Sequence, residues 1–516
     1  MKRFALGLAA SMLIAVLPSA GLAQETVLRV STGPGDVSTL DPHRASATND
    51  KAVVGWIYNA LVRFKPGSSE PRDIEPDLAE RWQVSDDGKV WTFHLRTGVR
   101  FHGDWGTLSA DDVVYSIQRA GDPRRSTFSS DFAAIDRVEK VDDLTVRITL
   151  KYGDVNFLGR VSNYHGGNIV SRRAAEELGD KFGTRPVGTG PFHFVEQVTQ
   201  QYVKLAAHAG YFRGKPKIDA IMVRVIPSDS ARELAFTSGE LDMMYGRREQ
   251  RWVDAARRRS GYNVEIFQPG EFRLLHINQS MPPLNDIRVR QAIAAAINVD
   301  ELVRYVGRDV GPRGCSVVPP GYLGEDCAGQ YSFDLPRARQ LLAEAGHRDG
   351  ITIKSIVSNI SAQQPFMEII QAQLARAGIK LEMQVVDHPT YQSQSRKNLS
   401  GLIFYGAARF PIADTYLSEF FHSRAIVGTP TAATNFSHCA VADREIVEAR
   451  TASSAEVQKR LWSEAQRKIM DAVCAIPLFE LRQVWVRSNR VDLGYPLRGA
   501  MNLAPPITEA TTLKPR

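Results

Sequence analysis

A strand–helix–strand pattern in the second half of the chain constrains the fold most. Ile351–Val357 is apolar and extended, and Gln364–Ala377 carries apolar side chains at helical spacing before Gly378 ends the helix. Ile379–Val386 then alternates apolar and polar residues, as a half-buried strand does. Two strands joined by one helix lie parallel, with a right-handed crossover. The pattern therefore predicts an α/β fold.

Similar alternations of helix and strand occur along the rest of the chain. We expect helices at Arg288–Val303, Leu335–Ala345 and Gln250–Arg258 and from Ser228 to about Thr237, and strands at Tyr202–Ala206, Ala220–Ile226 and Leu241–Met244. Elements that alternate in this way form lobes in which helices cover a sheet. A chain of about 490 residues without its first segment divides into two or three such lobes.

The segment from residue 76 to residue 116 predicts a hairpin that leads into a helix. Asp87 and Gly88 suit a tight turn that needs a positive φ. The residues after this turn alternate between apolar and polar, as in a half-buried strand. Ser109, followed by Asp112 three residues later, forms a start like a capping box for the next helix.

Residues 1–23 have the features of a secretory signal sequence. Lys2 and Arg3 give a charged start, and Phe4–Leu17 is mostly apolar. The alternative, a membrane anchor, is disfavoured because the apolar run is too short to cross a bilayer. The residue at the predicted cut is Gln24 and not a cysteine, so a bacterial lipid anchor is not expected. We therefore expect export to the periplasm.

The balance of charge argues against a nucleic-acid partner. The chain has 64 Lys and Arg against 57 Asp and Glu, and removing Lys2 and Arg3 leaves 62 against 57. An excess of five over this length favours solubility and does not make a basic surface for nucleic acid. The arginine runs at 247–248 and 257–259 are interpreted as a solvated helix face, with an anion site as the alternative.

Four cysteines allow three disulfide pairings in an oxidising compartment. Cys315 and Cys327 bracket a loop rich in Pro and Gly, and the flexibility of this loop favours their pairing. The bond would contribute about 3 kcal/mol in the chain-entropy account. Cys439 with Cys474 follows by elimination, with a free buried pair as the alternative. The spacing of Cys and His predicts no zinc site, and we expect no bound metal.

A set of short motifs occurs in a fixed order along nearly the whole chain. They are Leu40-Asp41-Pro42, IYNALV at 57–62, the segment 76–116, PVGTGPFHF at 186–194, GYFRGKPKIDAIMVRVIP at 210–227, GELDM at 239–243, NDIRVRQAIAAAINVDELV at 285–303, DLPRARQLLAEAG at 334–346 and AIPLFE at 475–480. Each motif alone is weak. In this order they resemble the bacterial extracellular solute-binding proteins that serve dipeptide, oligopeptide and nickel importers.

The resemblance implies a fold of the periplasmic binding protein type (class II, cluster C), with two α/β lobes, a hinge and a small inserted domain. Mapped on this chain, lobe I comprises residues 24–65, 186–275 and 481–516, the inserted domain 66–185, and lobe II 276–480. The hinge is expected near Phe272–Asn278 and Leu478–Leu481, where extended backbone passes between the lobes.

The resemblance also implies a function. An open form exposes a cleft, a solute bridges both lobes, and the closed form docks on the permease subunits of an ABC importer in the inner membrane. The solute is a peptide-like or small organic molecule, bound without a cofactor by a monomeric receptor. Alternatives on the same fold are a sensor, a chaperone or a metal-chelate binder. An enzyme is least favoured, because no G-x-S-x-G motif is present.

In peptide-binding relatives, an acidic residue in a loop containing Asp-Pro pairs with the amino terminus of the peptide. The matching segment of this chain, 401–421, has Ile412 and Ala413 at that place, and Asp414 lies two residues late. A charged amine buried against Ile412 would have no partner, which costs roughly several kcal/mol. This disfavours a peptide with a free amino terminus unless a re-routed loop lets Asp414 take the role.

Arg409 in the same segment changes the expected polarity of the solute. Its planar guanidinium can hold a carboxylate or phosphate through two hydrogen bonds, and a salt bridge is the alternative role. Tyr405 lies where relatives commonly have a tryptophan in the cleft, and Phe410 follows Arg409. Both aromatic residues are candidates for a wall of the cleft, with a place in the core as the alternative. Arg409 therefore predicts an anionic solute.

Further candidates come from the other side of the expected cleft. Ala47, Thr48 and Asn49 lie in a segment that rims the cleft in relatives. His165 is expected to do the same from the inserted domain. A hydrogen-bonded structural role is the alternative for His165, and it is favoured over a role as ligand to a metal chelate.

Overall fold

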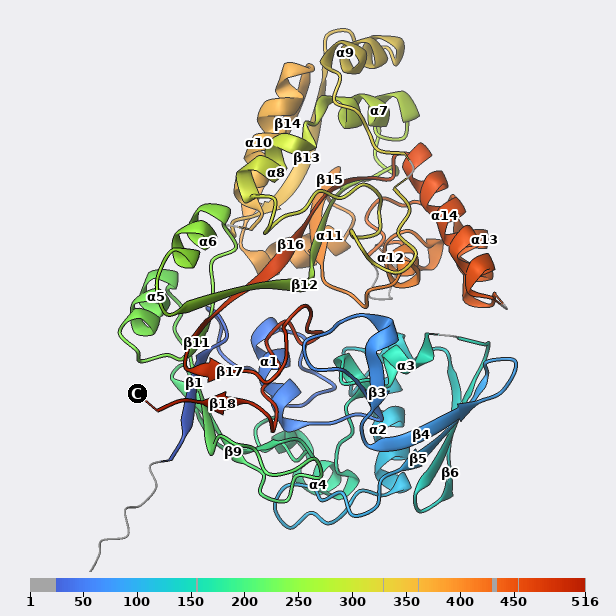
Figure 1. Cartoon of the computed structure of the whole chain (residues 1–516). Helices are drawn as coiled ribbons and strands as arrows, with labels where there is room; N and C mark the ends of the chain where they lie inside the picture. Colours follow the sequence, from blue (N-terminus) through green and yellow to red (C-terminus); the bar gives the residue numbers. More distant parts are fainter. Residues whose placement is uncertain are drawn as a thin grey trace, which may run out of the picture.

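The computed structural model describes residues 25–154, 156–327, 329–360, 362–428, 434–452 and 454–515. The predicted signal sequence, residues 1–23, lies outside these ranges. None of the helices in the described part of the chain has the length and apolar character needed to span a membrane. Figure 1 shows two lobes, one above the other, and two long strands that pass between them. We refer to the lower part of this view as lobe I and to the upper part as lobe II.

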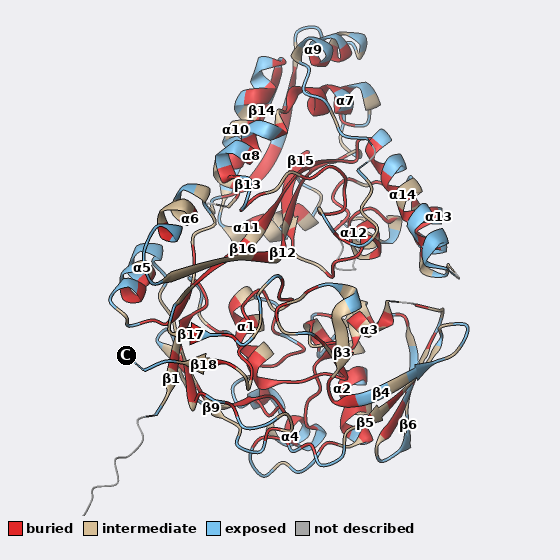
Figure 2. Cartoon of the chain, in the orientation of Figure 1, coloured by how far each residue is buried: buried red, intermediate tan, exposed pale blue. Residues whose placement is uncertain are grey.

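One eight-stranded sheet, with the order β15-β12-β16-β11-β1-β10-β9-β8, extends through both lobes. Its strands are β1 (Val27–Ser31), β8 (Phe192–Val198), β9 (Tyr202–Ala207), β10 (Ala220–Arg224), β11 (Met243–Tyr245), β12 (Tyr262–Ile277), β15 (Leu402–Ala407) and β16 (Ala475–Ser488). The three strands predicted between residues 202 and 244 are present, with ends shifted by one or two residues. β12 and β16 pair antiparallel, and β16 is buried along nearly its whole length (Figure 2). These two strands connect the lobes.

Lobe II contains the predicted strand–helix–strand unit. β13 (Ile351–Ser358) and β14 (Ile379–Val386) are parallel and paired residue by residue, and α10 (Gln364–Arg376) joins them. The prediction of this unit is confirmed. The other helices of lobe II are α7 (Ile287–Ala296), α8 (Val299–Val306), α9 (Leu335–Glu344), α11 (His388–Arg396), α12 (Ala413–Phe420), α13 (Asp443–Arg450) and α14 (Ala455–Asp471).

The single helix predicted at Arg288–Val303 is wrong, because the chain forms α7 and α8 with a break at residues 297 and 298. The buried side chain of Gln373 binds both backbone groups of Asn298. Its Oε1 accepts from the Asn298 N–H at 3.0 Å, and its Nε2 donates to the Asn298 carbonyl at 3.3 Å. These bonds replace the helical bonds that an unbroken helix would make there.

Lobe I holds the amino-terminal helix and a separate antiparallel sheet with the order β4-β5-β7-β6. Its remaining elements are α1 (Thr48–Ile57), β2 (Val62–Phe64), β3 (Ile74–Pro76), β4 (Ala79–Val84), β5 (Val90–Leu95), α2 (Ala110–Gly121), β6 (Ile135–Asp142), β7 (Thr145–Leu150), α3 (Phe157–Arg160), α4 (Arg172–Leu178), α5 (Asp229–Thr237), β17 (Val491–Asp492) and β18 (Thr512–Leu513). The helix α6 (Gln250–Arg257) lies beside β12, and its Val253 is buried in the core of lobe II. As predicted, Gly88 has a positive φ of 67° in the hairpin turn. The Asp112 carboxylate accepts from the Ser109 N–H at 3.0 Å before α2. The boundaries proposed for lobes and inserted domain stay a prediction.

The passage between the lobes is marked by an irregularity in the pairing of β12 with β16, between Phe267 and Glu271. The side chain of Glu480 is fully buried beside it. Its carboxylate accepts from the Gly270 N–H at 2.8 Å, from Gln268 Nε2 at 2.8 Å and from the Tyr322 hydroxyl at 3.0 Å. A buried carboxylate needs such donors. This network therefore holds β12 and β16 together at the place where both strands pass between the lobes.

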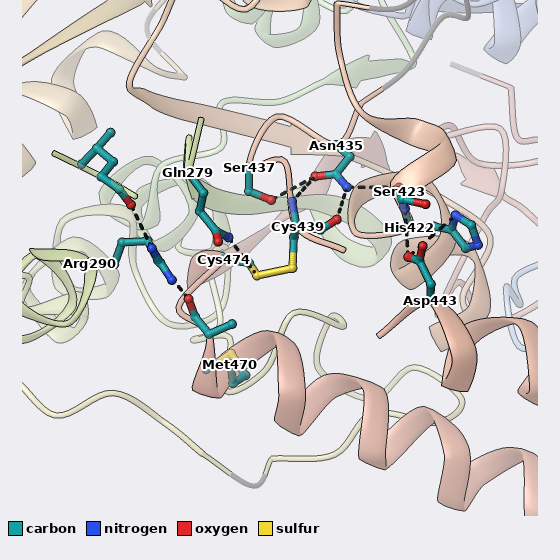
Figure 3. Close-up of a disulfide and its surroundings, with 12 residues drawn as sticks. Gln279, Arg290, His422, Ser423, Asn435, Ser437, Cys439, Asp443, Met470 and Cys474 are labelled. Carbon is teal, nitrogen blue, oxygen red and sulfur yellow. Dashed lines mark hydrogen bonds and ion pairs between the residues drawn. A yellow bond between two sulfur atoms is a disulfide. The ribbon is translucent and has the colours of Figure 1, made fainter. Parts of the chain in front are cut away.

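Both predicted disulfides are present, Cys315–Cys327 and Cys439–Cys474. Figure 3 shows the second bond, which ties the segment before β16 to the loop after α12. In that loop Asn435 Nδ2 donates to the carbonyl of Cys439 at 2.7 Å and to that of His422 at 3.0 Å. The bond therefore closes a loop that is also held by buried hydrogen bonds.

Candidate functional site

The two lobes contact each other through Phe410. Its ring lies 5.8 Å from that of Phe64 and 6.3 Å from that of Tyr164, measured between centroids, and both partners belong to lobe I. A Cβ atom on Gly159 would lie closer than 3.0 Å to the Phe410 ring, so the glycine makes room for it. Together with Ile412 and Met501 these rings form one buried apolar cluster across the boundary. The structure therefore has the lobes closed on each other.

Beside Phe410 lies a group of charged side chains from both lobes, which we call the Lys51–Arg409 cluster. From lobe II, Arg409 Nε donates to Glu419 at 2.5 Å. From lobe I, His165 lies between two partners, with its Nδ1 3.0 Å from Asp131 and its Nε2 3.2 Å from Lys51 Nζ. The His165 ring is also stacked between Tyr164 and Phe128.

The electrostatics of the Lys51–Arg409 cluster are balanced. Burial, reinforced by the charge of Arg409 opposite, lowers the pKa of Lys51 to about 8. Burial and the charge of Lys51 lower the pKa of His165 to about 3, so this imidazole is neutral at pH 7. Burial raises the pKa of Glu419, and Arg409 opposes that shift. At neutral pH the cluster holds two cations and two carboxylates.

A second group of charges, which we call the Arg273 cluster, consists of Arg248, Glu271 and Arg273. Arg248 Nη1 donates to Glu271 Oε1 at 3.0 Å, and Arg273 Nη2 donates to Oε2 of the same carboxylate. Burial alone would raise the pKa of Glu271, but the two guanidinium groups outweigh it and hold that pKa at about 2. One ionised carboxylate thus faces two cations, and the cluster carries a net charge of about +1 at all ordinary pH values.

Arg273 is the most buried member of its cluster, with only 5% of its surface exposed. It projects from β12 opposite Gly406 of β15, and its guanidinium carbon lies 5.7 Å from the centre of the Phe404 ring. Its Nε is buried and has no hydrogen-bond partner among the described residues. Burial lowers the pKa of Arg273, Glu271 opposes this shift, and Arg248 adds to it. Such an orphaned donor is costly in a folded protein.

Sequence reasoning did not identify Arg273. One signal was present, because Arg273 interrupts the otherwise apolar run from Phe272 to Leu275 in a strand. Such an isolated cation between buried neighbours needs a partner. The runs of arginine at 247–248 and 257–259 were interpreted as a solvated face, and the structure places Arg248 of this group against Glu271 with a side-chain exposure of 17%.

Two predicted residues of lobe II have partners within the lobe. Asp414, in the first turn of α12, accepts from Arg450 Nε at 3.0 and 3.2 Å. Tyr405 is buried on β15, with its ring 4.8 Å from that of Phe436. The roles of these two residues toward a solute stay predictions.

The predicted residues of lobe I lie at the start of α1. Ala47 is exposed and precedes the helix, and Thr48 is half-buried. Asn49 is buried, and its Nδ2 donates to the carbonyl of Gly35, so it holds the loop that precedes the helix. Lys51, one turn on, brings this end of α1 to His165. Of the predicted residues, the structure therefore groups His165 with Arg409 and Phe410.

Comparisons with known proteins agree with this architecture. MoaA of A. tumefaciens R10, solved with mannopinic acid, is 46% identical, with 95% of this chain and 100% of that chain covered and a TM-score of 0.88. DppA of Helicobacter pylori, solved with the peptide STSA, is 27% identical, with 95% and 98% covered and a TM-score of 0.82. Heme-binding protein A of Haemophilus influenzae is 30% identical over 84% of this chain and 83% of its own.

These relatives are solute-binding proteins, so the enzyme alternative is set aside and the periplasmic binding protein fold is confirmed. The model of the bacterial extracellular solute-binding proteins, family 5, matches residues 73–427, which is more than half of the chain. The chain is a member of the bacterial extracellular solute-binding proteins of family 5.

Proposed function

We propose that this protein is the periplasmic receptor of an ABC importer and that it binds a small organic acid of the kind of mannopinic acid between its lobes. The observation that carries this proposal is the net positive charge of the Arg273 cluster, at the crossing between the lobes. The likeness to MoaA, which was solved with mannopinic acid, supports it.

The solute would lie between residues of both lobes. Tyr405, Arg409, Phe410 and Asp414 would line the cleft from lobe II, and Ala47, Thr48, Asn49 and His165 from lobe I. Closure would follow from the preference of the solute for the closed form, since a ligand shifts an equilibrium only by its difference in affinity. Lobe contacts such as that of Phe410 on Phe64 and Tyr164 would form at this step.

A peptide with a free amino terminus is the less favoured solute. The acidic residue nearest to the predicted position, Asp414, already accepts two contacts from Arg450. A buried ammonium group would then have to compete with a guanidinium for the same carboxylate. Ile412, which precedes α12, has no charge to offer.

The partners that we propose are the permease subunits of the importer. The receptor would act as a monomer in the periplasm after removal of residues 1–23 and would need no cofactor. Net charge and size do not favour a nucleic-acid partner.

Calorimetric titration with mannopinic acid tests the proposed function, with glutathione and an unmodified dipeptide as controls. We expect binding of the acid alone and a rise of the midpoint of thermal unfolding, because a ligand at 100 times its Kd stabilises the folded state by about 2.7 kcal/mol. Small-angle scattering should show a more compact form with the acid bound. Binding of the dipeptide without binding of the acid would contradict the proposal.

A further inference from the structure

We propose that Arg273, together with Arg248, binds the acid group of the solute directly. The inference rests on the proposed function and names the residues that select an acid. It assigns the anionic part of the solute to the crossing of β12 between the lobes, and not to Arg409, where the sequence placed it.

The Arg273 cluster has more cations than carboxylates. Glu271 accepts one hydrogen bond from each arginine, so a single carboxylate serves two guanidinium groups. Each guanidinium has five N–H donors, and most of them remain for another acceptor. A second carboxylate would neutralise the cluster, and arginine pairs with carboxylates through two parallel hydrogen bonds.

The buried Nε of Arg273 lacks a hydrogen-bond acceptor. It is the orphaned donor of a side chain that is 5% exposed, and no described residue accepts from it. Leaving such a group without an acceptor costs about 1–3 kcal/mol. The Nε atoms of Arg213, Arg247 and Arg313 also lack an acceptor among the described residues, but these three side chains are only half-buried, whereas Arg273 is buried. An acid group that accepts from Nε and a terminal nitrogen would satisfy it.

Groups from both lobes surround Arg273. Tyr245 of β11 in lobe I, and His388 and Tyr391 of α11 in lobe II, are close enough to interact electrostatically with the Arg273 cluster. Glu271, with 26% of its side chain exposed, keeps the cluster open to solvent on one side. A group bound here touches both lobes, as a solute that closes them must.

The guanidinium of Arg273 is also held in place before any solute binds. Phe404 lies on one side of it, and a Cβ atom at Gly406 would lie closer than 3.0 Å to its side chain, so only glycine leaves it room. An arginine fixed in this way loses little side-chain entropy when an acid binds.

Arg409 differs from Arg273 in its hydrogen bonds and in the charge balance of its cluster. Its Nε already donates to Glu419 at 2.5 Å, and another of its nitrogens donates to the carbonyl of Ala408. Its cluster also contains as many carboxylates as cations at neutral pH. It is therefore the matched control for Arg273, an arginine whose charge is already compensated.

Affinity for mannopinic acid should be measured for the full-length protein and for three variants, Arg273→Met, Arg248→Met and Arg409→Met. We expect Arg273→Met to bind about 100-fold more weakly, as is usual when one partner of a buried charge pair is removed. The more exposed Arg248→Met should lose about tenfold, and Arg409→Met less than that. Circular dichroism and the melting temperature establish that each variant is folded.

A second measurement uses acetate as a probe of the cluster alone. Thermal unfolding of wild type and of Arg273→Met is compared in acetate and in chloride at equal ionic strength. We expect acetate to stabilise wild type more than the variant. Acetate bound elsewhere on the surface acts equally on both proteins and cancels in the comparison.

The outcomes separate the two proposals. If wild type binds mannopinic acid and Arg273→Met binds it equally well, the inference on Arg273 is overturned and the proposed function stands. If wild type does not bind mannopinic acid, the proposed function fails, and the acetate comparison decides about the cluster. Equal stabilisation of both proteins by acetate would overturn the inference, and a larger effect on wild type would support it.

Discussion

The Arg273 cluster and the Lys51–Arg409 cluster both bring cations and carboxylates together, but the two clusters differ in net charge. In the Lys51–Arg409 cluster each cation has a carboxylate, Glu419 for Arg409 and Asp131 on the side of Lys51 and His165. In the Arg273 cluster Glu271 is shared by two arginines. The difference shows that a buried arginine indicates an anion site only when neighbouring carboxylates do not already neutralise its charge.

The two clusters also suit different tasks. Equal numbers of cations and carboxylates at the boundary between the lobes can stabilise the closed form without a ligand. The contribution of such ion pairs is small where they are exposed to solvent. An unbalanced buried set is unfavourable until an anion arrives. The Lys51–Arg409 cluster therefore fits a contact between lobes, and the Arg273 cluster fits recognition of an acid.

After Arg273→Met itself, the largest effect on affinity at the Arg273 cluster should come from Gly406→Ala. The new Cβ would lie against the Arg273 guanidinium and force it to move, without changing any charge. We expect mannopinic acid to bind about tenfold more weakly, since misplacing one charged hydrogen bond costs about 1.5 kcal/mol. Calorimetric titration measures this change.

The control for Gly406→Ala is the same substitution made in Arg273→Met. If the substitution acts only through Arg273, it should have no further effect on affinity in that background, and the two changes are then not additive. Equal losses in both backgrounds would mean that Gly406→Ala disturbs the cleft by another route.

Glu419→Gln should have a smaller effect on affinity for mannopinic acid, and it should raise the affinity. The substitution removes the counter-charge of Arg409 and gives the Lys51–Arg409 cluster a net positive charge, as in the Arg273 cluster. We expect mannopinic acid to bind about threefold more tightly through the added attraction in a partly exposed site.

The same titration checks Glu419→Gln, with salt varied to identify the electrostatic part. Added salt should reduce the gain, because exposed charges are screened. A loss of affinity at every salt concentration would show that Glu419 itself contacts the solute, and the contrast between the clusters would then be wrong.

Local signals in the sequence predicted much of the fold. The strand–helix–strand unit of β13, α10 and β14 agrees with its predicted bounds within one residue, because its periodicity and terminal glycine are encoded in adjacent residues. The break between α7 and α8 could not be predicted in this way. It depends on Gln373, which lies 75 residues away from Asn298 in the chain.

The candidate site shows the same limit. The sequence predicted that Arg409 lies near Phe410 and on the cleft, but its neutral balance depends on Glu419 and on Lys51 from the other lobe. The surplus charge at Arg273 depends on Arg248, which lies 23 residues from Glu271 in the sequence. Counting counter-charges needs the tertiary structure, because the partners come from separate elements.

The smallest expected effect is a pH-dependent difference in melting temperature between wild type and Lys51→Met. The folded protein holds the pKa of Lys51 at about 8, below its ordinary value of 10.5, mainly through burial. Between these two values the unfolded chain binds a proton that the folded chain has released, so stability gained from Lys51 rises with pH in this window. Wild type should therefore gain melting temperature relative to Lys51→Met when the pH is raised from about 7 to about 9.5.

Arg273→Met provides the contrast. The pKa of Glu271, at about 2, lies far below this pH range, and arginine stays charged within it. The difference in melting temperature between wild type and Arg273→Met should therefore not change with pH. A pH-dependent difference for Arg273→Met, or a constant one for Lys51→Met, would mean that the two clusters do not differ in the way their charges indicate.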